Sequence, residues 1–141
     1  MSEPDAATIG AAWDRVTVAQ QNRAASFAET HPDGWAIDWM MAKAHLDPEP
    51  VWDVVVWVVE NTRSPWSITM IAAGEVETLL GFHGERFIDW IEDQARRSPR
   101  WRYMLTGVWP LGNEHTEVWA RVVQARRDAP VLAEGDPQPP V

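Results

Sequence analysis

Apolar side chains recur every three or four residues along most of the chain, which is the spacing of one helix face. Residues 5–29 contain no proline and carry this pattern at Ile9, Trp13 and Val16. Residues 34–45 repeat it and are predicted to turn one side toward the core, with Trp35, Trp39 and Ala42 on it. A proline and an Asp-Gly pair between the two segments are typical of a turn. The pattern therefore predicts two amphipathic helices joined by a turn.

The segment LDPEPVWDVVVWVVENT, residues 46–62, fits two structures. Its valines favour a strand. Its start favours a helix, because Asp47 can cap the first turn while Pro48 occupies the first helical position. Its length also favours a helix, and a helix that is apolar on all sides is a buried one. We predict a buried helix here.

Serine followed by proline marks the start of two later helices, at Ser64 and Ser98. Gly74 is predicted to end the first of these and to begin another helix that turns three side chains inward, namely Val76, Leu79 and Leu80. A further helix over 85–97 places apolar residues on one face, with Trp90 close to it: Phe87, Ile88, Ile91 and Ala95. A loop follows over 107–112, and Asn113 or Thr116 then caps a last helix that reaches Arg127.

Residues 129–141 are rich in proline and have no helical or strand pattern, so they are predicted to form a disordered tail. The remainder, residues 1–128, is predicted to be a single compact all-α domain of about eight short helices. These helices could stack as hairpins like a short solenoid, although no strict sequence repeat supports that arrangement.

Composition narrows the class of protein. Ten of the 141 residues are tryptophan and none is cysteine, so disulfide and thiolate chemistry are excluded. The net charge is −9, and residues 1–95 hold 16 acids against 5 bases, which disfavours nonspecific nucleic-acid binding. The start of the chain lacks a signal-peptide pattern, and the longest apolar run, 54–59, is too short to span a bilayer. A cytoplasmic protein without membrane contact is expected.

His83 is the first candidate for chemistry, because Gly84 follows it and two acids, Glu77 and Glu85, lie nearby in the sequence. Catalysis would need one of these acids within hydrogen-bond reach of the imidazole. A histidine and a glycine at this spacing also fit a helix C-terminus, where glycine adopts the left-handed conformation. We favour the helix-end role. No pattern of metal ligands or cofactor binding occurs, so neither a metal nor a cofactor is expected.

Residues 96–103 hold the second candidate, a cluster of arginines around aromatic side chains: Arg96, Arg97, Arg100, Trp101, Arg102 and Tyr103. Such a cluster can bind phosphates or bases. Two ion pairs at i,i+4 spacing, Glu92–Arg96 and Asp93–Arg97, would give these arginines a structural role instead. Trp101 with Trp109 could form an exposed docking edge, since tryptophan and arginine are enriched in interface hot spots.

The segment from Ile71 to Trp109 resembles a bacterial family of small, uncharacterised domains. The resemblance rests on an Ala-Gly-x-x-Glu-x-Leu-Leu helix, a His-Gly pair and a Gly-Val-Trp turn: Ala73, Gly74, Glu77, Leu79, Leu80, His83, Gly84, Gly107, Val108 and Trp109. This chain departs from the family at Glu75, where a proline is expected, and at Trp101, where a phenylalanine is usual. The resemblance implies a helical fold and a bacterial origin but no activity. It makes a shared site around Glu77, His83 and Trp109 worth testing without identifying that site.

Three functions follow from these residues. Small size, acidity and abundant tryptophan favour a protein that binds a basic partner, such as an immunity, inhibitor or adaptor protein. An enzyme with its site around His83 is the first alternative. A nucleic-acid-binding adaptor that uses the cluster at 96–102 is the second, and the net charge of −9 weighs against it.

Overall fold

Eight α-helices and one π-helical turn make up the secondary structure that the computed structural model describes, over residues 3–24, 26–133 and 138–141, and no strand occurs in these ranges. The elements in chain order are α1 (Ala6–Gln20), α2 (Phe27–Thr30), α3 (Gly34–Leu46), α4 (Glu49–Asn61), α5 (Pro65–Ile71), η1 (Ala72–Val76), α6 (Glu77–Arg97), α7 (Pro99–Leu105) and α8 (Glu117–Ala125). The all-α prediction, including the helix over the valine-rich segment, is confirmed.

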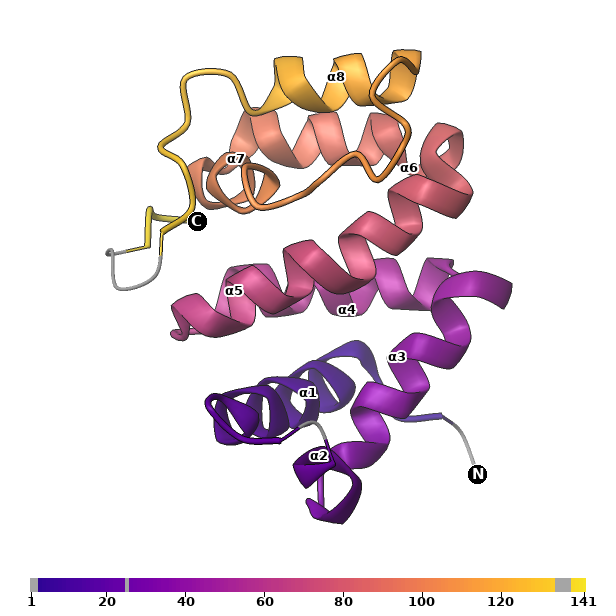
Figure 1. The fold of residues 1–141 in the computed structure, drawn as a ribbon, viewed down its shortest axis with the longest axis vertical. Helices are drawn as coiled ribbons and strands as arrows, with labels where there is room; N and C mark the ends of the chain where they lie inside the picture. Colours follow the sequence, from indigo (N-terminus) through magenta and orange to yellow (C-terminus); the bar gives the residue numbers. More distant parts are fainter. Residues whose placement is uncertain (1–2, 25, 134–137) are drawn as a thin grey trace.

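The helices lie in tiers along the long axis of the molecule (Figure 1). The indigo helix α1 and the short α2 form one end, α4 and α5 cross the middle, and α7 and α8 lie at the other end with the second half of α6. Chain order follows this stacking, and α3 runs beside α1 toward the middle tier. The three tiers share one hydrophobic core, so the chain forms a single domain.

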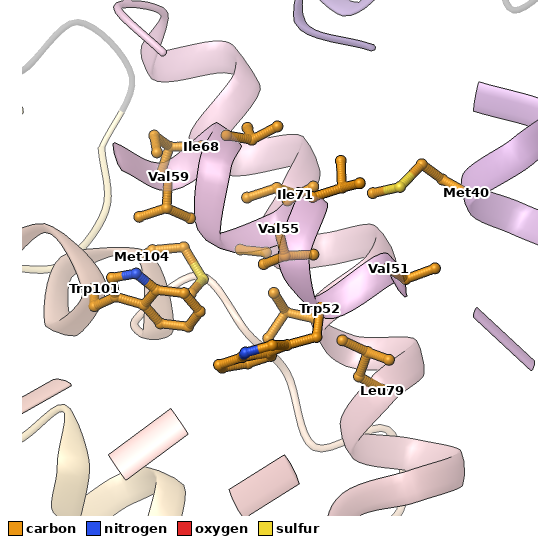
Figure 2. Close-up of a cluster of buried hydrophobic side chains, with 14 of the residues drawn as sticks. Met40, Val51, Trp52, Val55, Val59, Ile68, Ile71, Leu79, Trp101 and Met104 are labelled. Atoms are coloured by element: carbon orange, nitrogen blue, oxygen red, sulfur yellow. The ribbon is translucent and has the colours of Figure 1, made fainter. Parts of the chain in front are cut away.

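Trp52 of α4 lies at the centre of the core's aromatic cluster (Figure 2). Its ring centroid is 5.3 Å from that of Trp101, 5.7 Å from that of Phe87 and 5.8 Å from that of Trp90. Rings at these distances add a favourable electrostatic term to their burial. One side chain from the middle tier therefore joins α6 and α7 to the core.

The inner face of α3 differs from the predicted one. Trp35 is 40 % exposed and Ala42 lies outside, whereas the helix buries its small and flexible side chains, Ala36, Met40 and Ala44. A Cβ atom at Gly34 would lie 2.0 Å from the carbonyl oxygen of Ala28, so the start of α3 lies directly against the backbone of α2. Trp39, the remaining predicted inward residue, is partly buried against the core.

Helix starts agree with most of the predicted caps. The hydroxyl groups of Ser64, Ser98 and Thr116 each accept a hydrogen bond from a backbone N–H three residues ahead. The predicted cap at Asp47 is wrong, because α4 begins after Pro48 and no side chain caps it. Proline at the helix start has a fixed φ suited to the first turn, so this helix begins without a side-chain acceptor.

Gly74 does not separate two helices, and the prediction of a break there is wrong. The chain stays helical from α5 through η1 into α6, and η1 is a single π-helical turn over Ala72–Val76. The backbone leaves the helical conformation only later, at His83, whose φ of −138° and ψ of 28° produce a bend in α6. Figure 1 shows the chain reversing direction at this bend, so that the second half of α6 lies beside α8.

The tail lies against α7 where the structure describes it. The hydroxyl of Tyr103 is 3.3 Å from both the N–H and the carbonyl oxygen of Ala133, and the N–H of Leu132 donates to the Thr106 hydroxyl at 2.8 Å. Residues 134–137 lie outside the described residues, and disorder of the whole segment 129–141 stays a prediction.

Candidate functional site

The π-helical turn η1 separates two hollows in the surface. Glu77, just after this turn, lines the hollow on the α8 side, and Glu75 lines the one on the α3 side. Gly74 and Thr78 line both hollows. Single π turns within α-helices occur frequently at functional sites, because they redirect side chains that a regular helix would aim elsewhere. This turn therefore marks the region in which a site is most plausible on geometric grounds.

The hollow on the α8 side, the acidic groove, has a volume of about 570 Å³ and lies between the first half of α6, the loop 107–113 and α8. Three glutamates line it, Glu77, Glu85 and Glu117, whereas none of its described lining residues is Arg, Lys or His. Glu85 and Glu117 are exposed, and Glu77 is half-buried. The groove thus combines uncompensated negative charge with a concave shape.

Glu77 fixes one wall of the acidic groove. Its carboxylate accepts a hydrogen bond from the backbone N–H of Trp109 at 2.8 Å. Burial raises the pKa of Glu77, and the hydrogen bond from Trp109 opposes that rise. The structure therefore brings together Glu77 and Trp109, two of the three residues that the resemblance makes worth testing.

Large apolar side chains stand exposed along the acidic groove. Phe82, Trp109 and Leu111 are 68 %, 69 % and 71 % exposed, and all three line it. Leu111 also has a positive φ of 46°, a left-handed conformation that branched side chains adopt at an energetic cost. A leucine held this way with its side chain in solvent is not explained by packing.

His83 is not part of the lining of either hollow. Its Nε2 atom donates to the carbonyl oxygen of His45, 3.1 Å away in the last turn of α3. The non-helical angles at His83 place it at a bend inside α6, where one helical half ends and the other begins, and not at the C-terminus of a separate helix. The predicted left-handed conformation of Gly84 is wrong, because its φ is not positive. Instead, a Cβ atom at Gly84 would lie 3.0 Å from the Val118 side chain, so glycine allows α8 to approach α6.

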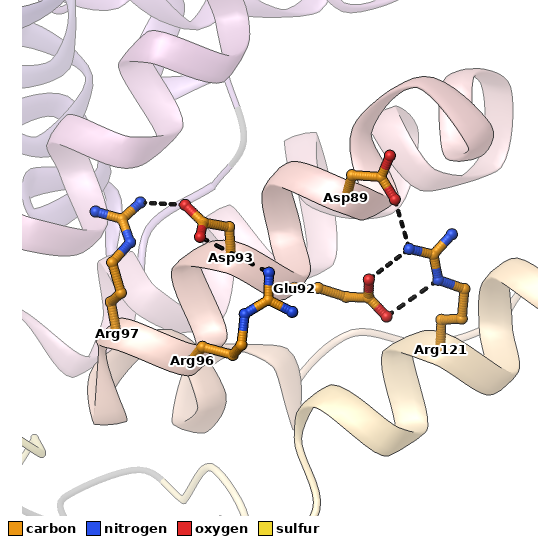
Figure 3. A network of polar contacts seen from close by, with 6 residues as sticks. All are labelled: Asp89, Glu92, Asp93, Arg96, Arg97 and Arg121. Carbon is orange, nitrogen blue, oxygen red and sulfur yellow. Dashed lines mark hydrogen bonds and ion pairs between the residues drawn. The ribbon is translucent and has the colours of Figure 1, made fainter.

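The arginine cluster does not form one surface. Arg96 and Arg97 are exposed, and both pair with Asp93, at 3.7 Å and 2.6 Å (Figure 3). The predicted Asp93–Arg97 pair is therefore confirmed. Exposed ion pairs of this kind contribute about 0.2–0.5 kcal/mol, so these two arginines have only weak structural partners.

Glu92 pairs across helices rather than with Arg96, and the prediction of that pair is wrong. Its carboxylate accepts from Arg121 of α8, with a distance of 3.0 Å from Nε, and Asp89 accepts from the same guanidinium (Figure 3). The hydrogen bonds from Arg121 lower the pKa of Glu92. A planar guanidinium between two carboxylates holds α8 against α6, which stabilises one wall of the acidic groove.

The remaining cluster residues serve the fold. Trp101 is fully buried, so the expected Trp101–Trp109 docking edge is wrong for Trp101 and only Trp109 is exposed. Arg102 donates to the Ala95 carbonyl. Arg100 donates to carbonyl oxygens at the end of α4 and in the tail, those of Val59, Glu60, Thr62 and Pro139. A side chain that satisfies several carbonyls is a helix C-terminal cap.

The hollow on the α3 side, the Glu75 cavity, was not foreseen. It has a volume of about 910 Å³, and Glu75 is only 8 % exposed. Burial raises the pKa of Glu75 to about 7. A glutamate counts as polar in any hydrophobic pattern, and this concealed its position. The signal that could have revealed it is spacing, because Glu75 lies four residues after Ile71 and four before Leu79, and both are fully buried.

These features define a small all-α domain with two hollows on either side of a π-helical turn. The chain belongs to a family of unknown function (DUF6869), whose model matches residues 22–129. No curated protein and no solved structure matches it. None of the helices in the described part of the chain is long and apolar enough to cross a membrane, and no three potential metal ligands group together among the described residues.

Proposed function

We propose that this domain binds a basic segment of a partner protein in the acidic groove, as an immunity, inhibitor or adaptor protein does. The observation that carries this proposal is the composition of the groove. Three glutamates line it without a compensating base among the described lining residues, and three large apolar side chains stand exposed along it. Charge and apolar surface of this kind favour an amphipathic, cationic segment as the occupant.

Both parts of a lysine or arginine side chain, the aliphatic stem and the charged head, have a suitable contact in this groove. The aliphatic stem can pack on the Trp109 ring, whose face also attracts positive charge. The charged head then reaches Glu85 or Glu117, whose carboxylates are exposed and have no cation beside them in the described lining. Arginine gains most from such a site, because its guanidinium binds carboxylates in a bidentate manner and stacks on aromatic rings.

Phe82 and Leu111 supply the apolar contact that a specific interface needs. Interfaces take most of their affinity from a few large side chains that become fully desolvated. The negative charge of the whole chain, −9, adds long-range attraction that speeds the encounter with a basic partner. The groove thus accounts for affinity, and the net charge accounts for the association rate.

The enzyme and nucleic-acid alternatives have less support. His83 bonds a backbone carbonyl and does not line either hollow, so no acid–base pair forms at the bend. Of the four arginines, Arg100 and Arg102 donate to backbone carbonyls and Arg96 and Arg97 pair with Asp93. No observation favours a phosphate or base at these positions.

The test compares capture by matched variants. Immobilised wild-type protein, Trp109→Ala and the double variant Glu85→Gln/Glu117→Gln are each exposed to lysate of the source organism, and bound proteins are quantified by mass spectrometry. The expected result is one stoichiometric basic partner that both groove variants lose. With that partner purified, calorimetry should show affinity weakened about 30-fold or more by Trp109→Ala, the size of a hot-spot loss.

The matched control removes the same charge elsewhere. Asp53 and Glu60 are exposed on α4 and do not line the groove, so Asp53→Asn/Glu60→Gln changes the net charge equally. This control should keep the partner at nearly wild-type affinity, with a slower association rate at low salt. A partner that all variants bind equally, or one with an acidic surface, would contradict the proposal.

A further inference from the structure

The Glu75 cavity contains a buried acid without a partner side chain. Glu75 is 8 % exposed and lines the cavity from η1. Among the described residues, no base forms an ion pair with its carboxyl, which interacts only with its own backbone N–H. Burial of a carboxylate is costly unless the charge is paired or hydrogen-bonded, so this position is unfavourable for the protein alone. A ligand that supplies the missing partner would remove that cost.

The surroundings of Glu75 specify the charge of such a ligand. Two further carboxyl side chains line the cavity, Glu29 of α2 and Asp38 of α3, and none of its described lining residues is Lys or Arg. A negatively charged ligand would therefore be repelled. A neutral apolar ligand would leave Glu75 without a partner. A cation can pair with the buried Glu75 and is also attracted by the exposed carboxylates of Glu29 and Asp38.

The walls of the cavity specify the body of the ligand. Trp13 and Trp35 line it together with three flexible or branched apolar side chains, Ile37, Met41 and Met70. Aromatic faces attract cations, and thioethers adapt to apolar groups of varied shape. The volume of about 910 Å³ lies within the range of small-molecule sites, about 300–1,000 Å³.

We propose that the Glu75 cavity binds a small organic cation, a primary ammonium group carried on an apolar or aromatic body. Its ammonium group donates hydrogen bonds to the Glu75 carboxylate, and its body packs between the α1 and α3 side chains of the cavity. The site lies on the opposite side of η1 from the acidic groove and does not depend on the function proposed for that groove.

Binding should release protons near neutral pH. Burial raises the pKa of Glu75 to about 7, and an ammonium beside it favours the ionised form. Four further side chains with ionisable groups line the same cavity, namely Glu29, His31, Asp38 and His45. The proton release that remains in Glu75→Gln comes from these other groups. The difference in proton release between the wild type and this variant therefore comes from Glu75.

The first experiment uses 2-phenylethylammonium as the probe, titrated into the full-length protein at pH 8 by calorimetry. Three relatives of the probe separate its features: 2-phenylethanol lacks the charge, 3-phenylpropionate reverses it, and ethylammonium lacks the apolar body. The expected result is saturable 1:1 binding of the probe, with each relative at least about tenfold weaker, because each loses one of the two interactions. Equal binding of the alcohol and the amine would overturn the proposal, as would no detectable heat with the probe at about 10 mM.

The second experiment uses variants. Glu75→Gln keeps the size of the side chain and should weaken the probe at least about tenfold. Asp53→Asn removes an exposed carboxylate of α4 that lines neither hollow, and it should leave the affinity unchanged. Equal affinity of Glu75→Gln and the wild type would overturn the assignment to Glu75. N-acetyl-lysine amide tests the alternative source of an ammonium group, a lysine of another protein. Tighter binding of this compound than of 2-phenylethylammonium would overturn the small-molecule assignment.

Discussion

Replacement of Glu75 by glutamine should make the protein more stable at alkaline pH and leave its stability at acidic pH nearly unchanged. Burial raises the pKa of this carboxyl from 4.5 to about 7 in the folded protein. Below pH 4.5 both the folded and unfolded states hold the proton, and no difference arises. As the pH rises to about 7, the unfolded state ionises first, so the free energy of unfolding falls. The full loss is present once the pH exceeds the pKa in the folded state.

The magnitude follows from the two pKa values. One pKa unit corresponds to about 1.4 kcal/mol, so the rise from 4.5 to about 7 costs the wild type about 3 kcal/mol of stability at pH 8.5. Glu75→Gln has no charge to bury and avoids this loss. With a urea m-value of about 2 kcal/mol per molar for a chain of this size, the unfolding midpoint of the variant should exceed that of the wild type by about 1.5 M at pH 8.5.

The assay is urea unfolding followed by circular dichroism at pH 5 and pH 8.5, for the wild type, Glu75→Gln and Glu85→Gln. The exposed Glu85 serves as the control, because its carboxyl is solvated in both states. The quantity of interest is the difference between the variant and the wild type at each pH, since other titrating groups contribute to both proteins. If that difference is the same at pH 5 and pH 8.5, Glu75 is not a buried acid and the reasoning fails.

Two further substitutions test the packing around α1. Gly10→Ala should lower the free energy of unfolding by about 1–3 kcal/mol, because the new Cβ atom would lie 2.5 Å from the Trp57 ring. This loss should outweigh the better helix propensity of alanine. Chemical denaturation measures the change, and a stabilised variant would show that the ring moves freely. Asp14→Ala should cost about 2–4 kcal/mol by the same method, because the buried hydroxyls of Thr62 and Ser67 donate to Asp14 at 2.8 Å and 2.5 Å and would lose their acceptor. Asp14→Asn keeps an acceptor oxygen and should recover more than half of that loss, whereas equal losses in both variants would point to the charge instead.

Local patterns in the sequence predicted most of the helices because their causes are local, although the single helix predicted over 5–29 is two helices, α1 and α2. Serine or threonine at Ser64, Ser98 and Thr116 begins helices through a hydrogen bond three residues away, which sequence spacing reveals directly. The inward faces of α1 and of the second half of α6 were likewise set by their own periodicity. Such elements can be predicted without information about the elements that pack against them.

The site could not be predicted in the same way, because it depends on contacts between distant segments. Trp109 meets Glu77 across 32 positions of the chain, and no local pattern encodes that pair. Trp101 lies in the core although four arginines surround it in the sequence. Its burial could not be predicted, because its helix is short and has too few residues to define an apolar face. The π-helical turn also left no trace, because Gly74 is typical of a helix end and therefore predicted a break.

The π-helical turn forms a wall that the two hollows share. Gly74 and Thr78 line both hollows, so the two spaces are separated by one helix with a diameter of about 10 Å. A molecule that contacts Gly74 or Thr78 from either space lies against the same short length of backbone. The amide chemical shifts of residues 74–78 should therefore respond to a molecule bound in either hollow. One isotope-labelled sample can follow binding in both hollows by NMR.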